Sequence, residues 1–159
     1  MTRSELEIII KKRAAIVVVL CAALLAINTM LGNSNSSKVM SNTIAANNIW
    51  AWYQAKNVRS VVYVTTADTT KGAVSERYRD EARRMKSDMD ELAEKAKALE
   101  AERDNAKARS TYFTYAGSAL QIAIVLSTAA ILAVAMPLFW ASTAVGVVGA
   151  SLMAYVLSM

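Results

Sequence analysis

The C-terminal part of the chain contains no charged residue, and this absence constrains the fold more than any other feature. From Tyr112 to Met159 there are 48 residues without a single Asp, Glu, Lys, Arg or His. A second uncharged and largely apolar stretch runs from Ala14 to Leu31. An apolar helix needs about 20 residues, at roughly 1.5 Å each, to cross a hydrocarbon core of about 30 Å. The longer stretch has room for two such helices and the shorter for one, so the sequence predicts three membrane spans.

Pro137 divides the longer stretch. It is the only proline in the chain, and because proline lacks the N–H that a continuing helix needs, it ends one helix and allows another to begin. A signal peptide is the competing interpretation of the first apolar stretch, since Lys11, Lys12 and Arg13 precede it, but no small-x-small cleavage site follows. The predicted segments are a basic tail at residues 1–13 and transmembrane helices at residues 14–31, 112–136 and 137–159.

The segment at residues 32–111 is charged and has a helical pattern. Its first residues, "GNSNSS", combine a glycine with good N-cap residues, so we expect the first membrane helix to end there and a new helix to begin near Ser36 or Ser37. The stretch "TTADTTKGAVS" around Gly72 predicts a turn. The predicted fold class is an all-α membrane protein: three transmembrane helices with an extramembrane antiparallel coiled-coil helical hairpin between the first and second spans.

Apolar residues at seven-residue spacing mark both helices of this hairpin. Such a repeat places a continuous apolar seam along one side of a helix, where it can pack against a partner helix. We expect the two seams to face each other. The first seam consists of Ile44, Ala51, Ala55, Val58 and Val62, and the second of Tyr78, Ala82, Met85, Met89, Leu92, Ala96 and Leu99.

Four aromatic residues lie beside the first seam. With that seam facing the partner helix, a rotation of 100° per residue places Trp52 and Tyr63 on one side, Trp50 on the other and Tyr53 at the back. A helix that is apolar on all sides needs cover on all sides, and one neighbouring helix cannot provide it. We therefore expect these residues to form an intersubunit or partner contact. The alternatives are an aromatic belt at the membrane surface and packing within the chain.

The stretch "AANNIWAWYQAKNVR" resembles a segment of a known protein family. The matching core consists of Trp50, Tyr53, Gln54, Ala55 and Lys56. It is similar to the Trp-x-x-Tyr-Gln-Ala-Lys core of bacterial membrane proteins catalogued as domain-of-unknown-function family 4337, in which an N-terminal span, a charged helical stretch and two C-terminal spans follow the same order. This chain departs from them in its short, basic tail. The resemblance implies an architecture and supplies no activity.

Small residues recur every four positions on the last two membrane helices. Small side chains at this spacing let helices approach closely in lipid. Each stripe can pack within the chain or against a neighbouring molecule, and Gln121 and Asn28 are expected to form hydrogen bonds between helices. The stripes consist of Ala119, Ala123 and Ser127 on the second helix, and of Ser142, Gly146, Ala150 and Ala154 on the third.

The sequence lacks the residues of a catalytic or metal site. There is no histidine and only one cysteine, Cys21, and we find no Gly-rich phosphate loop and no Gly-x-Ser-x-Gly motif. The predicted spans hold no ionisable group that would mark an ion path. The net charge of +5 arises from interleaved charges rather than a basic face, which argues against nucleic acid as a partner. We expect no enzymatic activity, no cofactor and no metal.

These patterns predict a non-enzymatic membrane protein that self-associates into a homo-oligomeric scaffold, with itself and membrane lipid as partners. The alternatives are an accessory subunit that docks on a larger membrane complex and a pore-forming or holin-like protein. The expected location is the bacterial inner membrane. Basic residues before the first span favour a cytoplasmic N-terminus and a periplasmic hairpin, whereas those before the second span, from Lys95 to Arg109, favour the opposite orientation. Because the first helix usually dominates, we expect the former.

Overall fold

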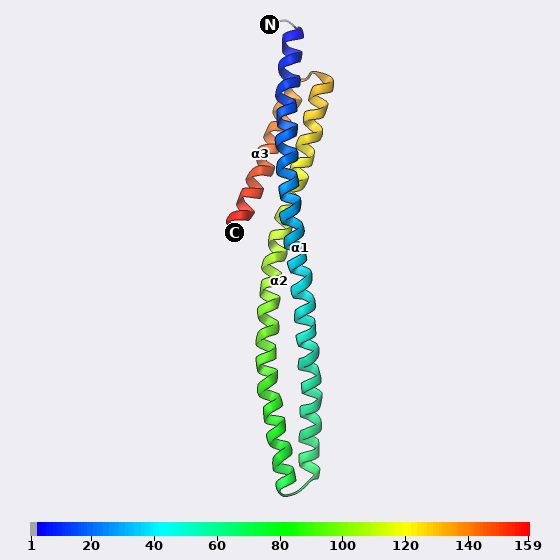
Figure 1. The fold of residues 1–159 in the computed structure, drawn as a ribbon, viewed down its shortest axis with the longest axis vertical. Helices are drawn as coiled ribbons and strands as arrows, with labels where there is room; N and C mark the ends of the chain where they lie inside the picture. Colours follow the sequence, from blue (N-terminus) through cyan, green and yellow to red (C-terminus); the bar gives the residue numbers. More distant parts are fainter. Residues whose placement is uncertain (1–2) are drawn as a thin grey trace. The chain divides into compact units, whose positions relative to one another are not determined.

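The computed structural model describes residues 3–159, and that part of the chain consists of three α-helices without a strand. Helix α1 spans Arg3–Thr69, α2 spans Ala73–Ala133 and α3 spans Met136–Ser158 (Figure 1). Each is long and apolar enough, by length and composition, to cross a membrane. The predicted all-helical fold with three candidate spans is therefore confirmed. Residues 1–2 of the predicted basic tail lie outside the described range, and the tail from Arg3 onward belongs to α1.

Contacts divide the chain into two compact units, which we describe separately. Unit 1 comprises Met1–Ser37 and Ala106–Met159, and unit 2 comprises Lys38–Asn105. Unit 1 therefore takes its residues from the beginning of α1, the end of α2 and all of α3. Unit 2 takes its residues from the remaining parts of α1 and α2 and from the turn that joins them.

Helix α1 does not end at the predicted stop at residues 32–37, so that prediction is wrong. The polar side chains of this stretch bind α2 within unit 1 instead of capping a helix end. The amide of Asn35 donates a hydrogen bond to the carbonyl oxygen of Ala106, and the hydroxyls of Ser36 and Ser110 lie 3.5 Å apart. Asn and Ser favour helix ends because their side chains form hydrogen bonds with nearby backbone groups. Here α2 supplies the hydrogen-bond partners instead, and α1 continues without a break.

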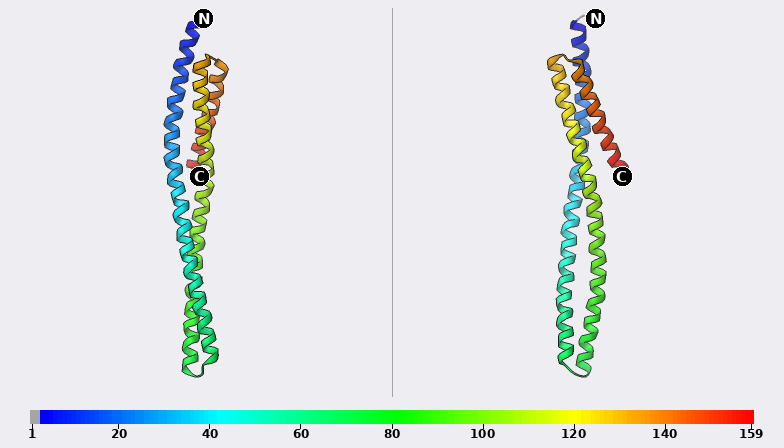
Figure 2. Two further views of the ribbon diagram at one scale, coloured as in Figure 1. Left: turned by 90° about the vertical axis from the view of Figure 1, so that its right-hand side faces the viewer. Right: turned by 180° about the vertical axis from the view of Figure 1, so that it is seen from behind.

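The turn between α1 and α2 in unit 2 lies where the sequence predicted it. The two helices are separated by residues 70–72, and Gly72 has a φ of +67°, in the left-handed region that glycine enters without a steric penalty. The hydroxyl of Ser75 donates a hydrogen bond of 2.7 Å to the carbonyl of Ala67 across this turn. The α1 and α2 segments of unit 2 then run beside each other (Figure 2). That this pair is an extramembrane coiled coil stays a prediction.

Unit 1 buries small side chains where its three helices meet. Large apolar side chains on the outer surface, such as Val125 and Leu132, remain exposed. An exterior of this kind suits contact with hydrocarbon better than contact with water. The two clusters of the core consist of Ala14, Ala130 and Phe139, and of Cys21, Leu120 and Ala123.

The link between α2 and α3 breaks the helix next to Pro137, where the sequence predicted a break. The N–H of Ala135 donates a hydrogen bond of 3.3 Å to the carbonyl of Ala130. Between these residues, Val134 has a φ of 51°. This left-handed conformation is unfavourable for a β-branched residue, because its Cβ approaches the following carbonyl oxygen.

Replacing Val134 with glycine is expected to stabilise the protein by about 1 kcal/mol, because glycine adopts the left-handed conformation without strain. The measurement is the midpoint of thermal unfolding of the detergent-purified protein, followed by circular dichroism. Leu132→Gly is the matched control, since it places the same glycine inside α2 and is expected to lower the midpoint. A lower midpoint for Val134→Gly would contradict the strain inferred here.

Candidate interaction surface

The α2 segment of unit 2 uses the face that the sequence predicted as its seam. Ala82, Met89 and Ala96 are buried. The aromatic rings of Tyr78 and of Tyr63 on α1 lie 5.9 Å apart. Because alanine leaves little side-chain volume between the helices, their backbones can approach closely at these positions. The seam residues Tyr78, Ala82, Met85, Met89, Leu92, Ala96 and Leu99 are all buried or half-buried.

The α1 segment of unit 2 packs through the face opposite the predicted seam. The prediction that the first seam faces α2 is therefore corrected. The packed face is aromatic and polar as well as apolar, so hydrophobic periodicity alone does not reveal it. The predicted seam residues Ile44, Ala51, Ala55, Val58 and Val62 are all exposed. The buried or half-buried residues that take their place are Ala46, Ile49, Tyr53, Lys56, Ser60, Tyr63 and Ala67.

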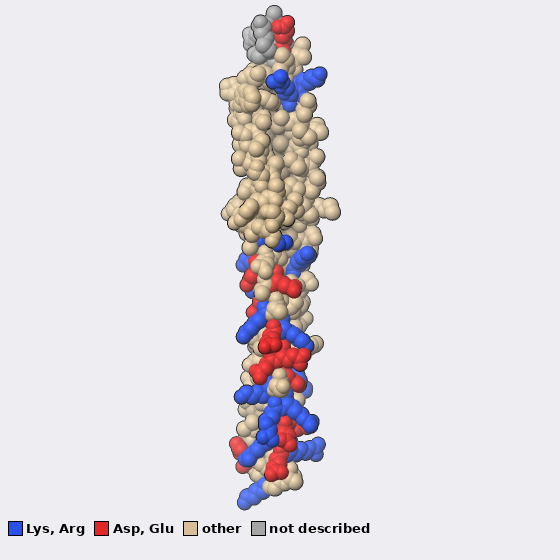
Figure 3. All heavy atoms as spheres, turned by 90° about the vertical axis from the view of Figure 1, so that its left-hand side faces the viewer, with Lys and Arg blue, Asp and Glu red and all other residues tan. Residues whose placement is uncertain are grey.

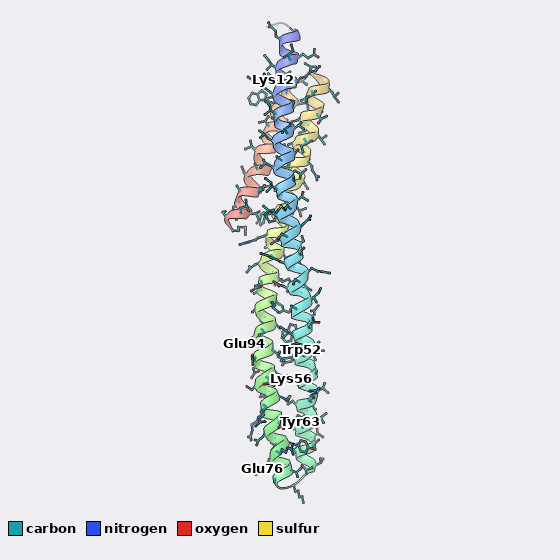
Figure 4. The ribbon with its side chains drawn as sticks, viewed as in Figure 1. Lys12, Trp52, Lys56, Tyr63, Glu76 and Glu94 are labelled. Atoms are coloured by element: carbon teal, nitrogen blue, oxygen red, sulfur yellow. The ribbon has the colours of Figure 1, made fainter. Side chains whose placement is uncertain are left out.

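Polar contacts join the two segments along this packed face. The indole N–H of Trp50 donates a hydrogen bond of 3.0 Å to the carboxylate of Glu100. Lys56, which Figure 4 labels on α1, forms an ion pair with Asp88 of α2. The hydrogen bond to a charged group contributes about 1.5–3 kcal/mol when buried, whereas the partly exposed ion pair contributes about 1 kcal/mol or less. These partners explain why a row that carries a lysine can face another helix.

Three of the four aromatic residues predicted at an intersubunit contact are used within the chain. The rings of Trp50 and Tyr53 meet edge to face at 5.4 Å, and Tyr63 contacts a tyrosine of α2. These contacts agree with the alternative of packing within the chain, whereas an intersubunit contact of these residues stays a prediction. Only Trp52 keeps most of its surface, being 64% exposed.

An apolar row, broken only at Asn47 and Asn48, covers the outside of α1 in unit 2. We call it the outer row, and Trp52 flanks it. Helix α1 itself places no acidic residue beside the outer row, because no Asp or Glu occurs between residues 38 and 67. The surface that α2 contributes to unit 2 is different: Lys and Arg alternate closely with Asp and Glu there (Figure 3). The outer row consists of Met40, Ile44, Ala51, Ala55, Val58 and Val62, all of them exposed.

Arg103 lies seven residues after Ala96, at the next position of the apolar repeat of α2. Its Nε donates a hydrogen bond of 2.9 Å to the carboxylate of Asp104. This hydrogen bond raises the pKa of the guanidinium further above its ordinary value. Arg103 therefore stays charged, and the mixed-charge surface of α2 does not lose this cation on mild changes of pH.

Only some residues of the predicted small-residue stripes on α2 and α3 are buried where these two helices pack. Ala123, Ser127, Ser142 and Gly146 are buried, and the hydroxyls of Ser127 and Ser142 form a hydrogen bond between α2 and α3. A step of four residues turns 400°, so such a stripe drifts about 40° around the helix at each step. The members at the ends of the stripes are less buried for this reason. Ala119 and Ala150 are half-buried, and Ala154 is exposed. Gln121, which belongs to neither stripe, is also exposed.

Gly149 is a contact residue that the four-residue stripe missed. A Cβ added there would lie 3.0 Å from Cγ of Leu120 and 3.2 Å from the backbone oxygen of Ala116. The packed face of α3 alternates steps of three and four residues, which a search at both spacings finds. Its buried residues are Phe139, Ser142, Gly146, Gly149, Met153 and Val156.

Asn28 forms the predicted hydrogen bond between membrane helices. Its side chain is only 4% exposed, and its amide N–H donates to the carbonyl oxygen of Phe113 at 2.9 Å. Gln121, predicted to act in the same way, makes no hydrogen bond within residues 3–159 that the structure describes. In that range no group of three or more His, Cys, Asp or Glu residues is placed to hold a metal ion.

Comparison with known proteins adds one finding to this geometry. Residues 10–159 match a protein family whose description is Domain of unknown function (DUF4337). The match covers nearly the whole chain and confirms the resemblance inferred from the segment around Trp50. No curated protein and no solved structure matches the chain.

Proposed function

We infer the function of this chain from its surfaces, because it belongs to the DUF4337 family, whose description assigns no activity. We propose a non-enzymatic integral membrane protein that self-associates into a homo-oligomeric scaffold. Three apolar helices supply the membrane anchor, and unit 2 supplies the contact between subunits. The observation that carries the proposal is the outer row of α1, an apolar surface that no part of the described chain covers.

The outer row has the form of a helix-packing surface. Its members Ile44, Ala51 and Val58 recur every seven residues, and Ala55 and Val62 recur at the same spacing beside them. This is the pattern with which one helix packs along another in a coiled coil. A helix surface that contacts only solvent does not require apolar residues at seven-residue spacing. The pattern therefore supports a helix as the missing partner.

A second copy of the chain is the partner that best fits this row. The exposed surface of α2 in unit 2 is densely charged and would leave its charges partly desolvated against apolar side chains (Figure 3). The same row on a second copy offers apolar side chains at the same spacing. Two copies anchored in one membrane point the same way, so their rows can pack in register about a two-fold axis.

The location proposed for the scaffold is the bacterial inner membrane. Lys11, Lys12 and Arg13 lie directly before the first apolar stretch. By the positive-inside rule they support a cytoplasmic N-terminus. The single span that precedes unit 2 then carries the chain across the membrane, so we expect unit 2 in the periplasm, where its coiled-coil hairpin would be extramembrane. Cysteine labelling of Lys38→Cys in whole cells, with Cys21 replaced by serine, would test this orientation.

Trp52→Ala is expected to weaken self-association about tenfold or more without loosening the monomer, because Trp52 is exposed beside the outer row and its burial in a contact would be lost. Trp50→Ala is the matched control. It should lower the thermal midpoint instead, because Trp50 bonds and packs within unit 2. The measurements are native mass spectrometry across a dilution series and thermal unfolding of the same samples.

A stronger perturbation tests the row itself. Val58→Glu places a charge at the centre of the outer row and is expected to give monomers, with helix content unchanged. An oligomer mass that both Val58→Glu and Trp52→Ala leave intact would overturn the assignment of this surface. A fixed mass that includes other polypeptides would instead make the chain an accessory subunit.

A further inference from the structure

A polar groove lies between α1 and α2 in unit 1. Its volume is about 260 Å³, and eight of its twelve lining residues carry a hydroxyl or amide group while none is charged. At roughly 30 Å³ per water molecule, the groove has room for the equivalent of about eight waters. The space is therefore sufficient for the polar part of a small amphiphile.

The groove lies within the part of unit 1 that carries no charge. No charged residue occurs at positions 14–37 of α1 or at any position of α2 and α3 after Arg109. Polar groups in such membrane-spanning segments need hydrogen-bond partners, because hydrocarbon offers none. A groove lined by eight polar side chains at this level therefore calls for a polar occupant.

Several of the lining groups lack partners in the described chain. Two lining residues do have partners, because the hydroxyls of Thr29 and Thr114 donate hydrogen bonds to backbone carbonyls of their own helices. Asn33 and Gln121 form no hydrogen bond within residues 3–159 that the structure describes, and the side-chain oxygen of Asn28 is buried without a donor. The groove therefore presents the amide groups of Asn33 and Gln121 to its occupant, whereas the unsatisfied oxygen of Asn28 is buried between the helices.

An apolar pocket continues from the groove along α2. Ser118 and Gln121 line both, and the remaining walls of the second pocket are formed by Ile122, Val125 and Leu126. At the opposite end, the exposed cations Lys107 and Arg109 precede Ser110 on the same helix. A cationic end, a polar middle and an apolar continuation follow the same order as the phosphate, glycerol and acyl chain of a phospholipid.

We propose that this groove binds an anionic glycerophospholipid, with the phosphate near Lys107, the glycerol ester groups in the groove and an acyl chain along Val125. The amide N–H groups of Asn33 and Gln121 donate hydrogen bonds to the ester oxygens, and the cations of α2 attract the phosphate. Phosphatidylglycerol carries a net negative charge, whereas the choline of phosphatidylcholine cancels the charge of its phosphate. The site therefore discriminates between two lipids of the same chain length.

The test is native mass spectrometry of the full chain, released from nanodiscs that contain equal amounts of phosphatidylglycerol and phosphatidylcholine with identical acyl chains. We expect one phosphatidylglycerol to be retained per chain. The double variant Asn33→Leu/Gln121→Leu should reduce this retention about tenfold, because both side chains are exposed to the groove and only their hydrogen bonds are removed.

Thr128→Leu is the matched control, because Thr128 is exposed on α2, lies outside the groove and bonds only to Ile124 of its own helix. Its lipid retention should equal that of the unmodified chain. Equal retention of both lipids by the unmodified chain would overturn the proposal. So would unchanged retention in the double variant, or the same loss in the control.

Discussion

Replacing Gly149 with leucine is expected to be among the most damaging single changes in unit 1, with a loss of about 3 kcal/mol or more. Overpacking a close contact costs about 1–3 kcal/mol, and the position already has no room for a methyl group. A Cβ would lie 3.2 Å from the backbone oxygen of Ala116, which cannot move without α2. Helix α3 must therefore separate from α2. The measurement is the unfolding midpoint in mixed detergent and SDS.

Ser151→Leu is the matched control, because it adds a leucine at an exposed position two residues away. Its midpoint should equal that of the unmodified protein. Gly149→Ala should give an intermediate loss, since its methyl group meets the same atoms with less volume. If Gly149→Leu left the midpoint unchanged, the close contact between α2 and α3 would be refuted.

The second large effect is expected from Asn28→Asp. The amide of Asn28 donates to the carbonyl of Phe113, and the aspartate oxygen that replaces it cannot donate when ionised. The variant would bring two acceptors together at a position that is only 4% exposed. Removing a buried hydrogen bond and burying a charge together cost about 3–5 kcal/mol or more. The shape of the side chain is unchanged, so electrostatics alone would cause the loss.

Asn28→Leu separates this effect from packing. It removes the donated hydrogen bond but also removes the side-chain oxygen that is buried without a donor. These changes oppose each other, so the unfolding midpoint in SDS should shift by about 1 kcal/mol or less. An aspartate variant as stable as the unmodified protein would show that the hydrogen bond to Phe113 does not stabilise the contact between the helices.

The all-helical fold followed from the sequence because each of its determinants is local. The turn at Gly72 and the break next to Pro137 depend on the backbone preferences of single residues. The seam of α2 was found because Met85, Met89 and Leu92 combine apolar character with seven-residue spacing. In each case the signal and the structure arise from the same stretch of chain.

The face that α1 turns towards α2 could not be found in this way. Hydrophobic periodicity selected the row through Ile44 and Val58, which the structure leaves exposed. The packed row can face α2 because its polar groups find partners there. Trp50 donates a hydrogen bond to Glu100, and Lys56 forms an ion pair with Asp88. Such pairing depends on the relative rotation and register of two helices, which no single segment encodes.

The contrast between local signals and packing between helices also explains the other differences between the predicted and the observed structure. The sequence by itself determined where helices exist, where they break and which stretches are apolar enough for a membrane, because propensity and hydropathy act residue by residue. Only the tertiary structure decided that α1 continues through residues 32–37, that Gly149 is a contact, and that the outer row is exposed. Those outcomes depend on which atoms another helix presents, and hence on packing between distant parts of the chain.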